Sequence, residues 1–203
     1  MPTYEPHDKF YRKARAMGLP SRAAFKIEEI IARNRLVPKN ARIVDLGCAP
    51  GGWLAILASA AGSGGRVVGV DIAPVKNPPP GVTTIVGDIL DVAVAARAEA
   101  ELGGRADLVT SDLAPKLTGI AARDEARTRE LIDSALGFAR RVLKPGAAMV
   151  VKLFMGAEFK QIVESFKPHF GVVEVTRTKA SRPGSSELYI VARGFIAVSN
   201  SRS

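Results

Sequence analysis

The chain has 203 residues, of which 47% are hydrophobic, enough for one well-packed domain and too many for a chain disordered over most of its length. Its single cysteine, Cys48, excludes an intramolecular disulfide, and its two histidines argue against a cysteine–histidine zinc site. The amino terminus lacks the apolar core of a signal peptide, and no apolar run reaches about 18 residues. We therefore expect a cytoplasmic protein that does not span a membrane.

Positive charge is concentrated towards the two ends of the chain. The net charge of +9 divides into +6 for residues 1–42, −1 for residues 43–175 and +4 for residues 176–203. A near-neutral body between basic ends is typical of a catalytic domain whose flanking surfaces contact a polyanion such as nucleic acid. A solvated basic surface without a partner is the alternative that charge alone leaves open.

The first forty residues predict a basic arm and then a helix. In residues 1–20, aromatic side chains alternate with cations, which suits phosphate contact and base stacking, although a frayed terminus has the same composition. A helical apolar pattern follows from residue 21, with Ser21 as its cap. Lys26 lies beside the apolar stripe, so its ammonium either reaches a neighbouring site or is solvated.

From Arg42 onward, strand patterns alternate with helix patterns. The expected strands are 42–46, 66–71, 82–86, 107–111, 147–153, 171–178 and 186–193, and the expected helices are 52–61, 89–102, 123–142 and 156–167. This order predicts parallel βαβ units with right-handed crossovers, and the last two strands, with no helix between them, predict an antiparallel hairpin. We expect one α/β domain over residues 21–194, a mostly parallel seven-stranded sheet with helices on both faces, followed by a partly disordered tail over 195–203.

The first expected strand leads into a glycine-rich turn, Gly47-Cys48-Ala49-Pro50-Gly51-Gly52-Trp53. Such a turn lets a ligand approach the backbone, and open α/β sheets bind cofactors at this edge. Asp71 and Asp88 end the next two strands, where they can bind a ribose hydroxyl pair and an adenine amino group. The G-x-x-x-G-G spacing disfavours a nicotinamide dinucleotide, whose pyrophosphate needs G-x-G-x-x-G, and favours S-adenosylmethionine. Asp71 and Asp88 acting only as turn formers is the alternative.

Charged residues also follow the later strands. Asp112 follows the fourth strand, Lys152 interrupts the apolar end of the fifth, and Glu187 begins the last strand. A lysine in an apolar run is costly unless it reaches a cleft or a counter-charge, or snorkels from an edge strand. Because the last strand is antiparallel, its start lies where the parallel strands finish. We expect Asp112, Lys152 and Glu187 to converge there, and Lys26 can join them.

Over residues 8–194 the chain resembles the FtsJ/RrmJ-type family of ribosomal RNA ribose 2′-O-methyltransferases. The motifs that carry the resemblance are Ser21-Arg22-Ala23-Ala24-Phe25-Lys26, Val44-Asp45-Leu46-Gly47-Cys48-Ala49-Pro50-Gly51-Gly52-Trp53, Ser111-Asp112-Leu113-Ala114-Pro115, Val150-Val151-Lys152-Leu153-Phe154 and Ser185-Ser186-Glu187-Leu188-Tyr189-Ile190-Val191-Ala192. It implies a class I (Rossmann-like) methyltransferase fold and S-adenosylmethionine as the methyl donor, with no metal. By motif, the catalytic set falls on Lys26, Asp112, Lys152 and Glu187, and the cofactor positions fall on Gly51, Trp53, Asp71, Asp88 and Asp112.

The resemblance also implies the substrate, a uridine of 23S ribosomal RNA in the large subunit, and we expect a monomer. A tRNA ribose methyltransferase and a non-catalytic RNA-binding or ribosome assembly factor remain as alternatives. For the chemistry, a base must take the proton of the ribose hydroxyl, and we expect Lys152 to be that base. The residues expected to form the RNA surface are Arg12, Lys13, Arg15, Arg22, Arg33, Arg35, Arg177, Lys179 and Arg182.

Overall fold

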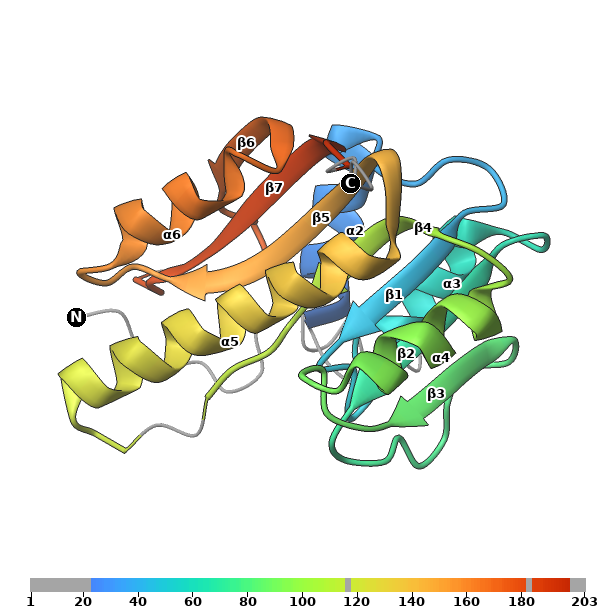
Figure 1. Ribbon diagram of the computed structural model, residues 1–203, viewed down its shortest axis with the longest axis horizontal. Coiled ribbons are helices and arrows are strands. Elements are labelled where there is room, and N and C mark those ends of the chain that lie inside the picture. The colour runs from blue at the N-terminus through green and yellow to red at the C-terminus, as the bar shows by residue number, and fades with distance from the viewer. Residues whose placement is uncertain (1–22, 116–117, 182–183, 198–203) are drawn as a thin grey trace, which may run out of the picture.

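The computed structural model describes residues 23–115, 118–181 and 184–197. They form a seven-stranded sheet with helices on both faces, as Figure 1 shows. In chain order the elements are α2 (Ala23–Asn34), β1 (Arg42–Leu46), α3 (Leu54–Ala61), β2 (Arg66–Asp71), β3 (Val82–Val86), α4 (Val92–Leu102), β4 (Ala106–Ser111), α5 (Ala121–Val142), β5 (Leu143–Phe154), α6 (Phe159–Phe166), β6 (Phe170–Thr176) and β7 (Glu187–Phe195).

The strand order is β3-β2-β1-β4-β5-β7-β6, and the first five strands in the chain are parallel. β7 is antiparallel to both of its neighbours, β5 and β6. The order reverses beside β1, which pairs with β2 on one side and β4 on the other. In open α/β sheets, such a reversal leaves a crevice at the carboxyl ends of the strands, where ligands bind.

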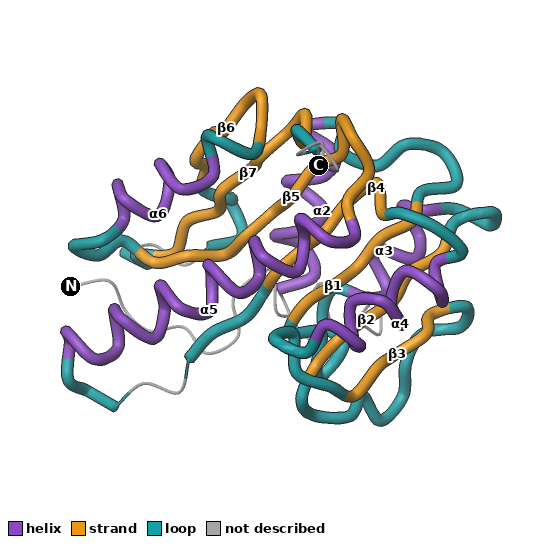
Figure 2. The backbone as a smooth tube through the Cα atoms, in the orientation of Figure 1, coloured by secondary structure: helices purple, strands orange, loops and turns teal. Residues whose placement is uncertain are grey.

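Two apolar cores enclose the sheet, so the expected α/β architecture is confirmed. Apolar side chains of α2 and α3, including Ile27, Ile30 and Leu57, pack on one face. Those of α4, α5 and α6, including Phe138 and Phe166, pack on the other. Figures 1 and 2 look onto the second face, with α4 and α5 in front of the strands and α2 and α3 behind them. No helix among the described residues is long and apolar enough to cross a membrane.

Most element boundaries after β3 differ from the sequence prediction by a few residues, and three of these differences are informative. β5 begins at Leu143, directly after α5, and its first residues include an exposed Lys-Pro-Gly that carries no strand pattern. α4 begins at Val92 because the carboxylate of Asp91 caps it, accepting the Ala93 amide at 2.8 Å. β7 includes Phe195, which is buried in the core, so the last strand ends two residues later than the expected residue 193. The expected basic arm of residues 1–20 lies outside the described residues.

Candidate active site

The β5–β7 ladder determines where the charged side chains of the last strands lie. In its register, Lys152 is opposite Tyr189 and Phe154 is opposite Glu187. Directly opposite residues of an antiparallel pair project from the same face, and residues two apart in a strand do so as well. Lys152, Phe154, Glu187 and Tyr189 therefore share one face of the sheet. That face is the one covered by α2, because Tyr189 belongs to the same apolar core as Ile27 and Ile30.

The four residues expected to be catalytic form two ion pairs at this sheet edge. Nζ of Lys26 lies 2.7 Å from the carboxylate of Glu187 and joins α2 to the start of β7. Nζ of Lys152 forms an ion pair with Asp112 and also donates to the Asp112 carbonyl oxygen at 3.1 Å. The exposed fraction of the Lys26, Glu187 and Lys152 side chains is only 11–14%, whereas that of Asp112 is 30%. The expected convergence is confirmed, and Asp112 is the member most open to solvent.

The carboxyl groups of this cluster have displaced pKa values. Burial raises the pKa of Asp112, an effect that the charges of Lys152 and Lys26 oppose and that of Glu187 reinforces. Burial also acts to raise the pKa of Glu187, but the hydrogen bond and charge of Lys26, aided by Ser181 and Tyr189, lower it overall. The two ion pairs are therefore close enough to influence each other's protonation.

The β1 turn connects this cluster to the expected cofactor site. The Asp112 amide donates to the Leu46 carbonyl at 3.0 Å, which places Asp112 beside the glycine-rich turn. Gly47 has a φ of +74°, and a Cβ there would lie 2.9 Å from Cδ2 of Leu113. Gly51 has a φ of +108°. Two glycines of the turn therefore hold backbone conformations that other residues rarely adopt, and one of them packs directly against the residue after Asp112.

Asp71, the first acid expected to bind the cofactor, accepts hydrogen bonds from the two loops beside it. The Asp71 carboxylate accepts the amide of Ala49, in the glycine-rich turn, at 2.9 Å and that of Ala73 at 2.8 Å. A carboxylate has about four acceptor positions, so Asp71 keeps capacity for a ligand. Its turn-forming role and its expected ligand role are therefore compatible.

The second expected acid, Asp88, and a cavity beside the glycine-rich turn are the remaining features of the expected cofactor site. Asp88 is exposed and accepts the Leu90 amide at 2.9 Å, so it too forms a turn and retains acceptor positions. A cavity of about 770 Å³ opens beside the glycine-rich turn and is lined in part by the Ala73–Pro74 segment after β2. Of the residues expected to bind the cofactor, only Gly51 lines it. A conformationally special turn, two carboxylates at successive strand ends and an adjacent cavity fit an adenosine-containing cofactor.

Trp53 has a different environment from the other expected cofactor residues. Its side chain is 2% exposed, and its indole Nε1 donates to the Ala23 carbonyl at 3.0 Å. Its ring lies against Tyr189, with 6.2 Å between the ring centroids. The indole therefore fastens the start of α3 to α2 and β7. A direct contact between Trp53 and the cofactor stays a prediction.

The structure adds residues to the site that the sequence reasoning missed. Oε1 of Glu187 accepts the Ser181 hydroxyl and the Tyr189 hydroxyl, each at 3.0 Å. Behind the glycine-rich turn, buried Asp45 accepts the Thr110 hydroxyl at 2.7 Å. Burial, opposed by that hydrogen bond, raises the pKa of Asp45 to about 8. Asp45 could have been found from the sequence because it is an acid inside the apolar run of β1. Tyr189 could have been found because it is two residues after Glu187 in a strand and therefore projects from the same face.

Part of the expected RNA surface lies beside this cluster. Arg33 of α2 bonds the Thr176 hydroxyl at the end of β6, and the Lys179 amide donates to the Glu29 carboxylate at 2.8 Å. Arg177 donates to the Ser185 carbonyl at 2.8 Å. α2 and the β6–β7 connection therefore bring basic side chains to the Lys26–Glu187 end of the site. Five of the expected surface residues lie outside the described residues: Arg12, Lys13, Arg15, Arg22 and Arg182.

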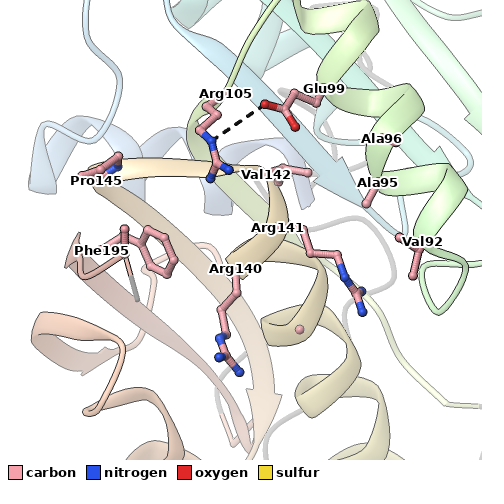
Figure 3. Close-up of a pocket in the computed structure, with 12 residues that line it drawn as sticks. Val92, Ala95, Ala96, Glu99, Arg105, Arg140, Arg141, Val142, Pro145 and Phe195 are labelled. Carbon is pink, nitrogen blue, oxygen red and sulfur yellow. Dashed lines mark ion pairs between the residues drawn. The ribbon is translucent and has the colours of Figure 1, made fainter. Parts of the chain in front are cut away.

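A larger cavity of about 810 Å³ lies away from this cluster, where α4 and α5 meet the ends of β5 and β7. Figure 3 shows Arg105, Arg140 and Arg141 around it, with Arg105 paired to Glu99 at 3.8 Å. None of the expected site residues lines it, so size does not identify the active site here. Among the residues that the structure describes, no group of three His, Cys, Asp or Glu side chains is placed to hold a metal ion.

The chain matches the family model of the FtsJ-like methyltransferases over residues 19–195. A Methanoculleus marisnigri protein named Ribosomal RNA large subunit methyltransferase E is 47% identical over 93% of this chain and 91% of its own length. The protein of that name from Azoarcus sp. is 44% identical, over 91% of this chain and 90% of its own length.

Solved structures agree with this assignment. A Plasmodium falciparum protein described as a ribosomal RNA methyltransferase superposes with a TM-score of 0.76 at 26% identity, covering 88% of this chain and 99% of its own. Human methyltransferase-like protein 13, in complex with S-adenosylhomocysteine, superposes with a TM-score of 0.61 at 13% identity, covering 88% and 85%, and shares the fold. The chain therefore belongs to the FtsJ-like methyltransferase family, whose methyl donor is S-adenosylmethionine.

Proposed function

We propose that this protein transfers a methyl group from S-adenosylmethionine to a ribose 2′-hydroxyl of large-subunit ribosomal RNA, at a uridine. The observation that carries the proposal is the Lys152–Asp112 pair, which the Asp112–Leu46 hydrogen bond places directly beside the glycine-rich turn. The relatives named as ribosomal RNA large subunit methyltransferases, which match over nearly the whole chain, support ribosomal RNA as the substrate.

When bound, S-adenosylmethionine supplies a methyl group activated by the sulfonium charge, so the transfer needs no Lewis acid. The residues proposed to hold it are the glycine-rich turn around Gly51, with Asp71 for the ribose hydroxyls and Asp88 for the adenine. Asp112, at the junction of that turn and the ion pairs, is proposed to contact both the cofactor and Lys152. Alignment of the ribose oxygen with the methyl carbon then supplies much of the rate enhancement.

Lys152 is proposed to be the general base. During methyl transfer, the proton of the ribose hydroxyl would pass to Nζ of Lys152. Nζ must be neutral to accept that proton. Burial raises the pKa of Asp112, so this carboxyl holds a proton more readily than an exposed aspartate does. Asp112 thus lies within ion-pair distance of the proposed proton acceptor, Lys152.

The Lys26–Glu187 pair is proposed to position the substrate. Glu187 accepts hydrogen bonds from Lys26, Ser181 and Tyr189, so the ammonium of Lys26 is held in a defined place. A fixed, mostly buried cation close enough to act on Asp112 suits a ribose oxygen or a phosphate of the RNA. All four side chains come from one chain, so the proposed site needs no residue of a partner subunit, and we propose a monomeric enzyme. Its only cysteine, Cys48, is free and buried, which is compatible with the cytoplasmic location expected from the sequence.

Methyl transfer from labelled S-adenosylmethionine tests the proposal. The substrates to compare are large ribosomal subunits, free large-subunit ribosomal RNA and tRNA, followed by mapping of the labelled nucleotide. We expect label in ribosomal RNA, at a ribose that becomes resistant to alkaline cleavage. Label confined to tRNA would replace the substrate assignment, and binding of ribosomal RNA without transfer would favour a non-catalytic assembly factor.

A further inference from the structure

One aromatic side chain next to Lys152 is exposed. Phe154 is 41% exposed, whereas every other phenylalanine, tyrosine and tryptophan side chain that the structure describes is buried or half-buried. A single exposed apolar side chain is common on protein surfaces and needs no explanation by itself. The position of Phe154 is informative, because it ends β5 at the edge of the sheet where the two ion pairs lie.

The strand geometry directs Phe154 to the catalytic face. Lys152 and Phe154 are two residues apart in β5, so both side chains project from the same face of the sheet. Phe154 is also directly opposite Glu187 in the β5–β7 ladder. Nζ of Lys152 lies 5.9 Å from the centroid of the Phe154 ring, within the range of a cation–π contact. The ring therefore contacts the proposed base on one side and remains open to solvent elsewhere.

We propose that Phe154 stacks on the base of the nucleotide that is methylated. The proposal rests on the proposed function, in which the ribose 2′-hydroxyl lies against Nζ of Lys152. The base is attached to the ribose carbon next to the one that bears this hydroxyl, so it must lie within reach of groups adjacent to Lys152. An exposed aromatic ring at that position is the platform on which an unstacked RNA base packs. Stacking also orients the ribose, which the alignment of oxygen and methyl carbon requires.

A cycle of two deletions tests this contact directly. One deletion is Phe154→Ala, and the other is an RNA whose mapped target nucleotide is replaced by an abasic ribose that keeps its 2′-hydroxyl. The RNA is the ribosomal substrate, free or assembled, that the wild-type protein methylates. We expect Phe154→Ala to lower kcat/KM on normal RNA between about fivefold and about a hundredfold. Phe154→Trp should retain most of the activity because it keeps a stacking surface.

The coupling between the two deletions decides the outcome. We expect the abasic substrate to be poor for the wild-type protein and no poorer for Phe154→Ala, because the same contact is already lost. If removal of the base lowers kcat/KM by the same factor in the wild type and in Phe154→Ala, the proposal is overturned. Phe154 would then only shield Lys152 from solvent. Absence of transfer by the wild-type protein on any ribosomal RNA would instead refute the proposed function.

Two controls separate stacking from damage to the fold or the cofactor site. Val172→Ala removes an apolar side chain of similar exposure, 44%, from β6, near the opposite end of the β6–β7 ladder. It should leave kcat/KM and the abasic penalty unchanged. S-adenosylhomocysteine affinity and the unfolding temperature of Phe154→Ala should match those of the wild type. A large loss of either would show that the residue supports the fold or the cofactor site rather than the base.

Discussion

Nζ of Lys152 binds Asp112 through both the side chain and the main chain, because it forms an ion pair with the carboxylate and donates to the carbonyl oxygen at 3.1 Å. The side chain of Lys152 is 12% exposed, so its position is set by this partner rather than by solvent. Asp112 is in turn tied to the end of β1. The proposed base is thus anchored to the segment after β4, which is hydrogen-bonded to the end of β1, where the glycine-rich turn begins.

The first prediction concerns Lys152 itself. Lys152→Ala should abolish methyl transfer and leave S-adenosylhomocysteine binding nearly intact, because Lys152 is not among the residues proposed to hold the cofactor. Lys152→Arg should also be inactive, since a guanidinium keeps the charge and the pairing with Asp112 but does not release its proton in proteins. Single-turnover transfer and calorimetric binding measure the two effects. An active alanine variant would refute the base assignment, and an active arginine variant would reduce the role of Lys152 to electrostatics.

The second prediction concerns the glycine-rich turn. Gly47→Ala should lower the unfolding free energy by about 1–3 kcal/mol, because alanine is strained in the left-handed backbone conformation of this residue. The steric clash of the new Cβ, 2.9 Å from Cδ2 and 3.0 Å from the amide nitrogen of Leu113, should add to this loss. The substitution should also weaken S-adenosylhomocysteine binding. Gly81→Ala is the control, with a φ of +77° and nothing within 4 Å of its Cβ. Urea unfolding and calorimetry should show a larger stability loss for Gly47→Ala and a binding loss for it alone. Equal losses in both variants would contradict the role of the Leu113 contact.

The third prediction concerns the pH dependence of stability. Burial raises the pKa of Asp45 to about 8 from an ordinary value of 3.8, so between these values the folded protein holds a proton that the unfolded chain has released. Stability from this group is therefore present at low pH and is lost as the pH rises towards 8. Asp45→Asn keeps the acceptor for Thr110 and removes the titration, so unfolding curves at pH 5, 6, 7 and 8 should show a weaker decline than the wild type. An unchanged slope would mean that Asp45 is ionised in the folded protein.

Much of the fold was predictable because the strands are β-branched runs that end in small or acidic residues. The apolar pattern located β1, β2 and β3 at their observed bounds, and it placed Asp112, Lys152 and Glu187 at one edge. The partners within that cluster were not predictable. The Lys26–Glu187 pair joins residues 161 positions apart, and it depends on how α2 packs over β7. The environment of Trp53 was also not predictable. Its hydrogen bond to the Ala23 carbonyl and its ring contact with Tyr189 are tertiary contacts that no local sequence pattern encodes.

The last prediction concerns the RNA surface beside the Lys26–Glu187 pair. Arg33, Arg177 and Lys179 belong to α2 and the β6–β7 connection, which hydrogen bonds hold together. If these side chains contact phosphates, RNA affinity should fall steeply with salt, and each single alanine substitution should reduce the slope of log K against log salt by about 1. Arg129→Ala is the control, because Arg129 pairs with Asp133 on α5, across the sheet from α2. Filter binding of large-subunit ribosomal RNA between about 50 and 200 mM salt measures the effect. This range of roughly fourfold is wide enough to resolve such slopes. Slopes that are equal in all four variants and the wild type would move the RNA-binding surface elsewhere on the protein.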